Sequence, residues 1–257
     1  MSISTFQLWN RSFGWGVFGV ALLTYGLTVE PTASFWDAGE YIATAAKLQV
    51  GHPPGAPLFQ MMGAFFALFS TSPENIALMV NYMSVFSSAF TVLFLFWTLT
   101  LLMKKLPAFK SFENNAERLT FFGSASVGAL AFCFSDSFWF NAVEAEVYAM
   151  ATFILSLLFW LGLRWEKEMN SPRGDRWLLL ISFIIGLSFG VHFMGLLTIP
   201  AIGMIYYFKN TPKVTVKSFI LANIVSVAIL LFIFNLLLPT SLAFFGNSEV
   251  FFVNQIG

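Results

Sequence analysis

The chain has 257 residues, no net formal charge at pH 7, and a composition that is 58% hydrophobic and only 10% charged. Soluble domains usually have about 25% charged residues, so an ordinary soluble domain is excluded. The lack of net positive charge gives no indication of nucleic-acid binding. The apolar runs are long and continuous rather than alternating, which argues against a β-barrel and predicts an all-α polytopic membrane protein.

Seven apolar runs are predicted to be membrane helices. They cover residues 13–28, 76–103, 119–134, 147–163, 177–189, 193–208 and 218–238. The first outer loop, residues 30–70, is expected to hold interfacial helices over 36–49 and 56–70, because the second of these is too short to cross a hydrocarbon core about 30 Å thick. We expect residues 1–257 to form a single transmembrane module, or the N-terminal part of a longer protein.

The basic residues support this topology. With the N-terminus inside and the spans alternating, 12 of the 13 lysines and arginines fall on the inner side, and Lys47 alone lies outside. Loop lysines and arginines set the orientation of membrane proteins, so this asymmetry supports both the span count and the direction. We expect a multi-pass protein of the bacterial inner membrane with a cytoplasmic N-terminus and periplasmic acidic loops, in preference to an endoplasmic-reticulum protein with these loops in the lumen.

The polar residues of the first outer loop share one face of the predicted helix 36–49, because they recur at spacings of three, four and three. These residues are Asp37, Glu40, Thr44 and Lys47. The sequence His52-Pro53-Pro54-Gly55 follows, and its prolines end the helix because proline lacks a backbone donor and fixes φ. The pattern predicts a charged stripe with His52 held near it by a rigid turn. Solvated interfacial charges and an ordinary turn histidine are the alternative interpretation.

Further polar groups are expected on the same side. The second outer loop contains Glu144 and Glu146, and Tyr148 follows Glu144 by one helical turn; alternatively, these acids only cap or solvate a helix start. His192 lies between two short apolar segments, which indicates a hairpin tip lining a wet cavity, where an ionisable group is a functional candidate. The alternative is a histidine hydrogen-bonded inside the bundle. Cys133, the one cysteine, is expected to be a core residue.

Three segments together resemble a known family. They read DAGEYIATAAKLQVGHPPGAPLF, FWFNAVEAEVYAM and GLSFGVHFMG. They resemble the GT-C membrane glycosyltransferases and, within these, the bacterial relatives of protein O-mannosyltransferases. The HPPG and AVEAEVY segments are specific in combination, whereas the spacing Asp-x-x-Glu alone is a weak signal. The resemblance covers nearly the whole chain and implies a GT-C-like module of about seven transmembrane helices.

The resemblance also implies a reaction. The donor would be a sugar carried on a polyprenyl phosphate, and the acceptor a hydroxyl on the outer face, on a protein serine or threonine in preference to a glycan. The resemblance implies Asp37 as the base that takes the acceptor's proton, with Glu40 orienting the acceptor or holding Asp37. Direct displacement would invert the anomeric centre. Such enzymes resemble one another in acting without a metal, so no cofactor is expected, although the acids would offer ligands for Mg²⁺ or Mn²⁺.

The departing phosphate needs hydrogen-bond donors or positive charge, and the outer face offers few. We expect His52 and His192 to lie on either side of the phosphate, with Lys47 as the other candidate. The residues expected to contact the sugar hydroxyls are Glu144, Glu146 and Tyr148. An alternative from another class is a non-catalytic subunit or lipid-binding scaffold of a larger membrane complex. A transporter fits poorly because the acids gather at one surface.

Overall fold

The computed structural model describes residues 5–109, 112 and 114–256. The described residues form helices and no strand, which confirms the all-α prediction. The chain divides into two compact units, residues 1–195 and 196–257. That both units belong to one transmembrane module stays a prediction. Lys110, one of the bases expected on the inner side, lies outside the described residues.

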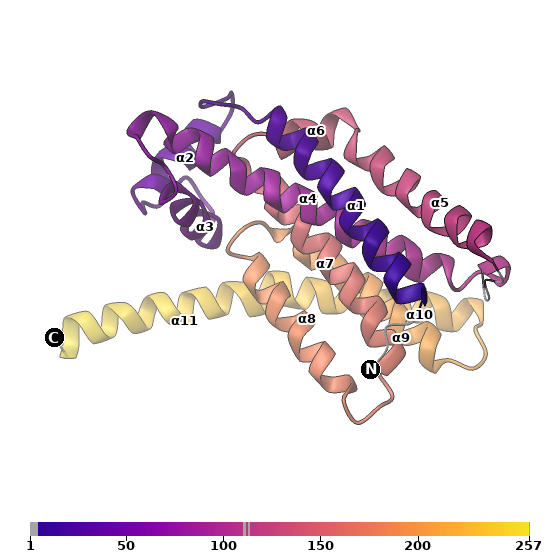
Figure 1. Ribbon diagram of the computed structural model, residues 1–257. Coiled ribbons are helices and arrows are strands. Elements are labelled where there is room, and N and C mark those ends of the chain that lie inside the picture. Colours follow the sequence, from indigo (N-terminus) through magenta and orange to yellow (C-terminus); the bar gives the residue numbers. More distant parts are fainter. Residues whose placement is uncertain (1–4, 110–111, 113, 257) are drawn as a thin grey trace. The chain divides into compact units, whose positions relative to one another are not determined.

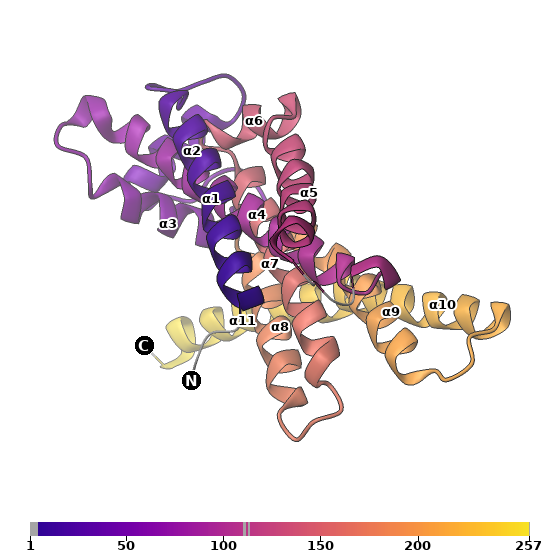
Figure 2. The ribbon, with the colours of Figure 1, turned by 45° about the vertical axis from the view of Figure 1, so that its right-hand side comes forward.

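The first unit is a bundle around α4. Its helices are α1 (Thr5–Leu27), α2 (Ala38–Ala46), α3 (Pro57–Ala67), α4 (Ile76–Met103), α5 (Asn115–Cys133), α6 (Asp136–Ala142), α7 (Val147–Glu168) and α8 (Gly174–Ser188), with short 3₁₀ turns at Pro73–Asn75 and Pro107–Phe109. Helix α4 packs against α1, α5 and α7. Figures 1 and 2 show these long helices side by side and the short helices α2, α3 and α6 gathered at one end.

The packing follows from the residues on the facing helices. Alanines such as Ala21, Ala89 and Ala125 are fully buried, and small residues of this kind let helix backbones approach closely in an apolar environment. Phenylalanines fill the wider gaps toward the start of α1 and α5. The Tyr25 hydroxyl donates to the Cys133 carbonyl at 2.8 Å, joining α1 to α5. Cys133 itself is buried and free, so the prediction of a core residue is confirmed.

The second unit contains α9 (Thr198–Asn210), α10 (Val216–Phe232) and α11 (Leu238–Phe251), with π-helical segments at Ile233–Leu237 and Phe252–Ile256. Helices α9 and α10 approach closely at Gly203, where a Cβ would lie 2.3 Å from the Ser226 hydroxyl. The last predicted span ended at residue 238, but the helix continues beyond it. Pro239 is tolerated because it lies in the first turn of α11, directly after the π-helical segment, where the regular α-helical hydrogen bonding is already interrupted.

The predicted number of spans is not reached. Three helical stretches are long and apolar enough to cross a membrane, namely Pro73–Met103, Val147–Glu168 and Val216–Ile256, and α5 with α6 would make a fourth if their 71° bend lies within one broken span. Helices α8 and α9 have 15 and 13 residues, about 22 and 20 Å of helix, which is short for a core of about 30 Å. The fold is that of a membrane protein, and the count of seven stays a prediction.

The helices of the first outer loop differ in length from the prediction. Helix α2 covers Ala38–Ala46 rather than 36–49, and its end is followed by Leu48 in a left-handed conformation, with φ of 49°. A branched side chain at positive φ cannot continue a right-handed helix. Helix α3 covers Pro57–Ala67 within the predicted 56–70, and its proline occupies the first turn, where no backbone donor is needed.

Candidate functional site

The loop before α2 and the loop before α7 are hydrogen-bonded to each other and to the bundle. The Asn81 side chain on α4 donates to the Glu30 carbonyl at 2.7 Å. The Glu30 backbone N–H donates to the Val143 carbonyl at 3.0 Å, and the Ser34 hydroxyl donates to the Glu144 carboxylate at 2.5 Å. The loop before α2 and the loop before α7 therefore lie against each other, so their acids share one end of the first unit.

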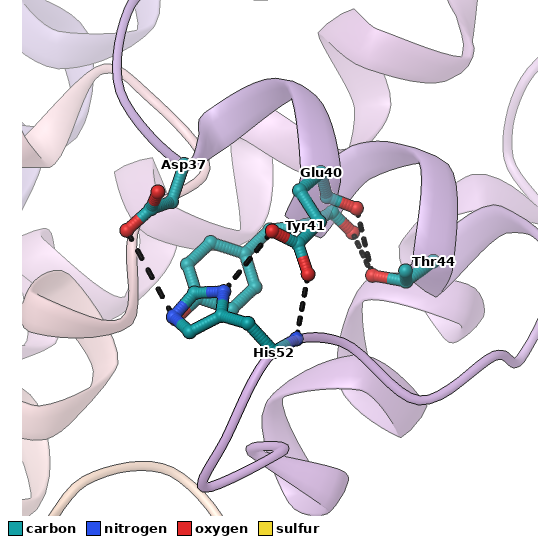
Figure 3. Close-up of polar contacts among 5 residues, drawn as sticks. All are labelled: Asp37, Glu40, Tyr41, Thr44 and His52. Carbon is teal, nitrogen blue, oxygen red and sulfur yellow. Dashed lines mark hydrogen bonds and ion pairs between the residues drawn. The ribbon is translucent and has the colours of Figure 1, made fainter.

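Asp37, Glu40 and His52 form a compact cluster, shown in Figure 3. Glu40 Oε1 accepts from the His52 backbone N–H at 2.6 Å, and Glu40 Oε2 lies 3.0 Å from His52 Nδ1. His52 Nε2 lies 3.9 Å from Asp37 Oδ2. The two bonds from His52 hold the pKa of Glu40 below its usual value. Both Glu40 oxygens are thus engaged with His52, while the Asp37 carboxylate stays 57% exposed.

Local sequence explains why the cluster forms. Asp37 occupies the N-cap of α2, but its side chain makes no capping hydrogen bond there. Its carboxylate instead points toward the His52 ring (Figure 3). Asp37 and Glu40 are one turn apart, so they flank the ring from one helix face.

The turn that carries His52 depends on glycine at two positions. The Gly55 N–H donates to the His52 carbonyl at 2.8 Å, and Gly55 has a φ of +93°, which favours glycine. A Cβ on Gly51 would lie 3.2 Å from Glu40 Oε1, which is closer than nearly all side chains allow. Glycine at both positions lets the chain reverse and bring the imidazole against Glu40.

Glu146 adds a buried carboxyl group beside the cluster. It directly precedes α7 and is only 6% exposed. Burial, together with the charges of Asp37 and Glu144, raises the pKa of Glu146 from 4.5 to about 7. Tyr41 lies among the same acids, and burial followed by the charge of Glu146 raises its pKa to about 12. A carboxyl group that titrates near neutrality beside exposed acids is a feature of functional sites as well as of structural clusters.

The loop after α8 is fixed to the start of α3. The Gly190 carbonyl accepts from the backbone N–H groups of Leu58 and Phe59 at 2.7 and 3.1 Å. A Cβ on Gly190 would lie 2.8 Å from Leu58 Cβ, so this approach requires glycine. Because α3 follows the His52 turn directly, these bonds hold the two histidine-bearing loops in register.

His192 is half-buried in this loop. Its Nδ1 accepts from the Met194 backbone N–H at 3.2 Å, which leaves Nε2 as the proton-bearing nitrogen of the neutral ring. Burial lowers the pKa of His192 and so favours this neutral form. The centroid of the His192 ring lies 5.4 Å from that of the Tyr148 ring. Tyr148 interacts electrostatically with Tyr41. The centroid of the Tyr41 ring lies 5.6 Å from that of the His52 ring.

Six of the eight predicted site residues are therefore linked at one end of the first unit. They are Asp37, Glu40, His52, Glu146, Tyr148 and His192. Of the other two, Glu144 is also joined to the cluster, because the Glu146 backbone N–H donates to its carbonyl at 2.9 Å and its charge raises the pKa of Glu146. Glu144 is buried against Ser34, where burial raises its pKa and its carboxylate is directed into the loop contact. Lys47 caps the far end of α2, and its exposed ammonium has no hydrogen bond or ion pair with the described residues.

Two residues of this region were missed by the sequence analysis. Tyr41 follows Asp37 by four residues, so the helical spacing could have placed it beside the acids. Gln60 on α3 is 4% exposed, and neither amide atom has a partner among the described residues. A Cβ on Gly51 would lie 3.4 Å from Gln60 Nε2. No sequence pattern marks a buried amide of this kind, since the position follows from how α3 packs.

The cluster also has the donor types of a metal site. Asp37, Glu40 and His52 each offer one ligand atom, and these atoms lie within 4.8 Å of one another. Two carboxylates and an imidazole would suit Mn²⁺ better than Mg²⁺, which prefers oxygen ligands. However, the Glu40 oxygens already bind His52, so a metal would have to displace these bonds. The expectation of a metal-independent site stays a prediction.

An apolar groove of about 350 Å³ lies between α3, α4, α7 and α8. Two of its lining residues, Leu58 and Leu187, also lie at Gly190, so the groove reaches the loop that carries His192. Ser87 is the one lining side chain with a polar oxygen, and its hydroxyl is bonded to the Met83 carbonyl. The groove thus offers an aliphatic surface next to a polar, histidine-containing site.

Comparison with known proteins agrees with these features. A family model described as the N-terminal domain of protein O-mannosyl-transferase TMEM260 matches residues 37–215. The Dictyostelium discoideum protein O-mannosyl-transferase tmem260 is 26% identical over 156 residues, which are 60% of this chain and 17% of that protein. The Mus musculus protein O-mannosyl-transferase TMEM260 is 28% identical over 176 residues, 67% of this chain and 22% of that protein. The chain thus spans about a fifth of these relatives, and no solved structure matches it.

Proposed function

The chain belongs to the protein O-mannosyl-transferase TMEM260 N-terminal domain family, and we propose that it carries the reaction centre of a membrane glycosyltransferase. The donor is a sugar on a polyprenyl phosphate, and the acceptor is a serine or threonine hydroxyl of a protein. The relatives' names support a protein acceptor. The observations that support the proposal are the cluster of Asp37, Glu40 and His52 and an apolar groove that reaches the loop carrying His192.

The proposed chemistry is a single displacement. The Asp37 carboxylate takes the proton of the acceptor hydroxyl while that oxygen forms a bond to the anomeric carbon. The bond from the anomeric carbon to the phosphate oxygen breaks, and the electron pair leaves with the polyprenyl phosphate. No covalent enzyme intermediate forms, so the anomeric configuration inverts. The role of Asp37 is supported by its exposed carboxylate, which is neither a helix cap nor hydrogen-bonded to His52.

The other residues position groups for this step. Glu40 holds the imidazole of His52 rather than the acceptor or Asp37, because both of its carboxylate oxygens are engaged by His52. His52 and the Nε2–H of His192 are donors for the departing phosphate. Glu146 and Tyr148 are the proposed contacts of the sugar hydroxyls. The groove between α3 and α7 takes the first isoprene units of the donor, which keeps the phosphate at the membrane surface.

The proposed location is a bacterial inner membrane, with the N-terminus in the cytoplasm and the site facing the periplasm. The distribution of charge supports this orientation. Arg11, Lys104 and Lys105 lie at one end of the long helices of the first unit, and the site acids lie at the loops of the other end. Loop cations favour the cytoplasmic side.

The test is the release of polyprenyl phosphate by the purified chain from a panel of polyprenyl-phosphate sugars, with a serine- and threonine-containing peptide as acceptor. Asp37→Asn should lower kcat by at least ~100-fold, because general bases contribute about 10²- to 10⁴-fold. Asp136→Asn is the matched control, since Asp136 is an exposed acid of the neighbouring helix α6. It should leave turnover unchanged. A chelator should have no effect.

The result also separates the enzyme from a lipid-binding scaffold, which the apolar groove would equally suit. A scaffold would bind the polyprenyl phosphate sugar without releasing the phosphate, and Asp37→Asn would change neither property. Turnover by the Asp37→Asn protein at the rate of the unaltered chain would rule out the assignment of the base. Loss of turnover in chelator would replace the metal-independent scheme by one in which Asp37, Glu40 and His52 hold a divalent ion.

A further inference from the structure

A second polar pocket lies at the opposite end of the first unit, away from the proposed reaction centre. It has a volume of about 300 Å³ and is formed by the start of α1, the end of α4 and the end of α7. Its lining residues are Gln7, Asn10, Arg11, Trp97, Leu101, Trp160 and Arg164. The pocket shares no residue with the cluster around His52 or with the apolar groove.

Two arginines give the pocket its charge. The Arg164 guanidinium lies 5.8 Å from the Trp160 ring and 5.5 Å from the Trp177 ring, so two indoles fix its position. Its Nε is buried and has no hydrogen-bond partner among the described residues. Arg11 faces the same space from α1. A buried guanidinium donor without an acceptor is costly, which points to an anionic ligand.

Most of the surrounding charges are positive, although Glu168, one turn after Arg164, accepts from Trp177 Nε1 at 2.9 Å. Lys167 is close enough to Arg164, Lys104 and Lys105 to be repelled by all three. The nearby acid Glu166 is engaged in an ion pair with Lys105. The field at the pocket therefore attracts an anion, and the arginine fork suits a phosphate group in particular.

The pocket also contains an acceptor that a phosphodiester anion, which carries no proton, cannot satisfy. Asn10 Oδ1 is buried and has no partner among the described residues, whereas the Asn10 backbone carbonyl accepts from Trp97 Nε1 at 3.3 Å. The walls beside it are apolar and aromatic, formed by Trp97, Leu101 and Trp160. The complementary ligand is thus a phosphodiester that carries both a hydrogen-bond donor and an aliphatic tail.

We propose that this pocket binds the head group of a membrane glycerophospholipid, with Arg11 and Arg164 on the phosphodiester and Asn10 on a hydroxyl or ammonium group of the head. Basic pockets between membrane helices on the side of the positive loops are suited to such head groups. Tryptophans at helix ends lie at the level of lipid head groups, which agrees with the positions of Trp97 and Trp160 near the ends of α4 and α7.

The test is lipid binding by the purified, delipidated chain in detergent, measured by native mass spectrometry and by the thermal unfolding midpoint. Phosphatidylglycerol and phosphatidylethanolamine are compared with phosphatidylcholine, which has the same phosphodiester but no donor on its head group. Both donor-bearing lipids should bind about fivefold more tightly than phosphatidylcholine. Inorganic phosphate at the same concentration should neither bind nor raise the midpoint.

A double variant, Arg11→Gln with Arg164→Gln, should weaken phosphatidylglycerol binding by at least tenfold. Arg118→Gln is the matched control, because Arg118 is a half-buried arginine of α5 that donates to Asn115 outside the pocket. Undiminished binding by the double variant would overturn the proposal, and so would equal binding of phosphatidylcholine or competition by inorganic phosphate. The comparison of lipids on the unaltered chain keeps the test decisive if the double variant fails to fold. None of these outcomes depends on glycosyltransferase activity.

Discussion

At one end of the first unit, the polar side chains come from loops and helix starts, whereas at the other end they come from the sides of three long helices. The His52 cluster is held by backbone hydrogen bonds of the loops, including those that Glu40 and Gly190 accept. The pocket of Arg11 and Arg164 is held by the packing of α4 against α1 and α7. Loops let acids and histidines approach to within 3–4 Å, while rigid helices keep the arginines apart around a space of fixed size.

The largest expected effect tests whether the loop contacts really build the cluster end. Gly190→Ala would place a Cβ 2.8 Å from that of Leu58, so either the His192 loop or α3 has to move. We expect a destabilisation of about 2–3 kcal/mol, in the range of overpacked sites, and at least a tenfold loss of turnover. Thermal unfolding and polyprenyl phosphate release measure the two effects.

Gly186→Ala is the control for that change, because a Cβ on Gly186 meets nothing within 4 Å. Alanine also favours the helix, so this variant should be at least as stable as the unaltered chain. If Gly190→Ala behaved like Gly186→Ala, the loop after α8 would not be fixed by its contact with α3. The His52 cluster would then not depend on contacts between loops, and the proposed contrast with the helix-built end would be wrong.

The next effect is a pH dependence that arises from Glu146. Its pKa is raised from 4.5 to about 7, so the folded chain binds this proton more tightly than the unfolded chain does. Stability from this group is therefore full below pH 4.5 and is lost as the pH rises toward 7. One pKa unit corresponds to about 1.4 kcal/mol; after allowance for solvent screening, we expect ionised Glu146 to cost about 2 kcal/mol at pH 8.

Glu146→Gln should remove that cost, since glutamine keeps an acceptor for the Asp37 backbone without a charge. The variant should unfold at a higher temperature than the unaltered chain at pH 8, and the difference should disappear near pH 4.5. Asp136→Asn, at an exposed position, should show no such dependence. A constant difference between the Glu146→Gln and unaltered proteins at all pH values would mean that the carboxyl group is not buried as described.

A smaller effect is expected at Glu40, whose role is to hold His52. In Glu40→Gln the amide can still accept from the His52 N–H, but the charged bond to Nδ1 is lost. We expect kcat to fall about tenfold, as for the loss of one charge-assisted hydrogen bond. His52→Asn should cost more, because it also removes a proposed donor to the phosphate, and the double variant should cost little more than His52→Asn alone, because Glu40 acts through His52. Additive losses would indicate that Glu40 acts independently of His52.

Much of the cluster end could be predicted from sequence because its determinants are local. The spacing of Asp37 and Glu40, the prolines after His52 and the acids before α7 all lie within short segments. Their meeting across segments came from the resemblance and from the charge asymmetry rather than from spacing. Two contacts decide the geometry of this end: Glu40 bonds to His52, and the Gly190 carbonyl accepts from the Leu58 N–H. Both contacts join separate segments of the chain, and no local sequence pattern encodes them.

The helix-built end could not be predicted in the same way. Asn10, Trp97 and Arg164 are far apart in sequence, and each alone reads as an ordinary residue at a helix end. The predicted count of seven spans is not shown by the structure for a related reason. Hydropathy located the apolar runs, but the bend between α5 and α6 and the shortness of α8 and α9 are set by tertiary packing.

The smallest expected effect concerns Lys47, the one base assigned to the outer side. Its position in the sequence made it a candidate ligand of the donor phosphate, but Lys47 lies at the C-terminal end of α2, away from Asp37 at the N-terminal end. Its ammonium is exposed, and a solvated charge at that distance is largely screened. Lys47→Gln should therefore change kcat and KM for the polyprenyl-phosphate sugar by less than about twofold. A tenfold rise in KM would place the phosphate near the end of α2, and His52 and His192 would then lose their proposed role.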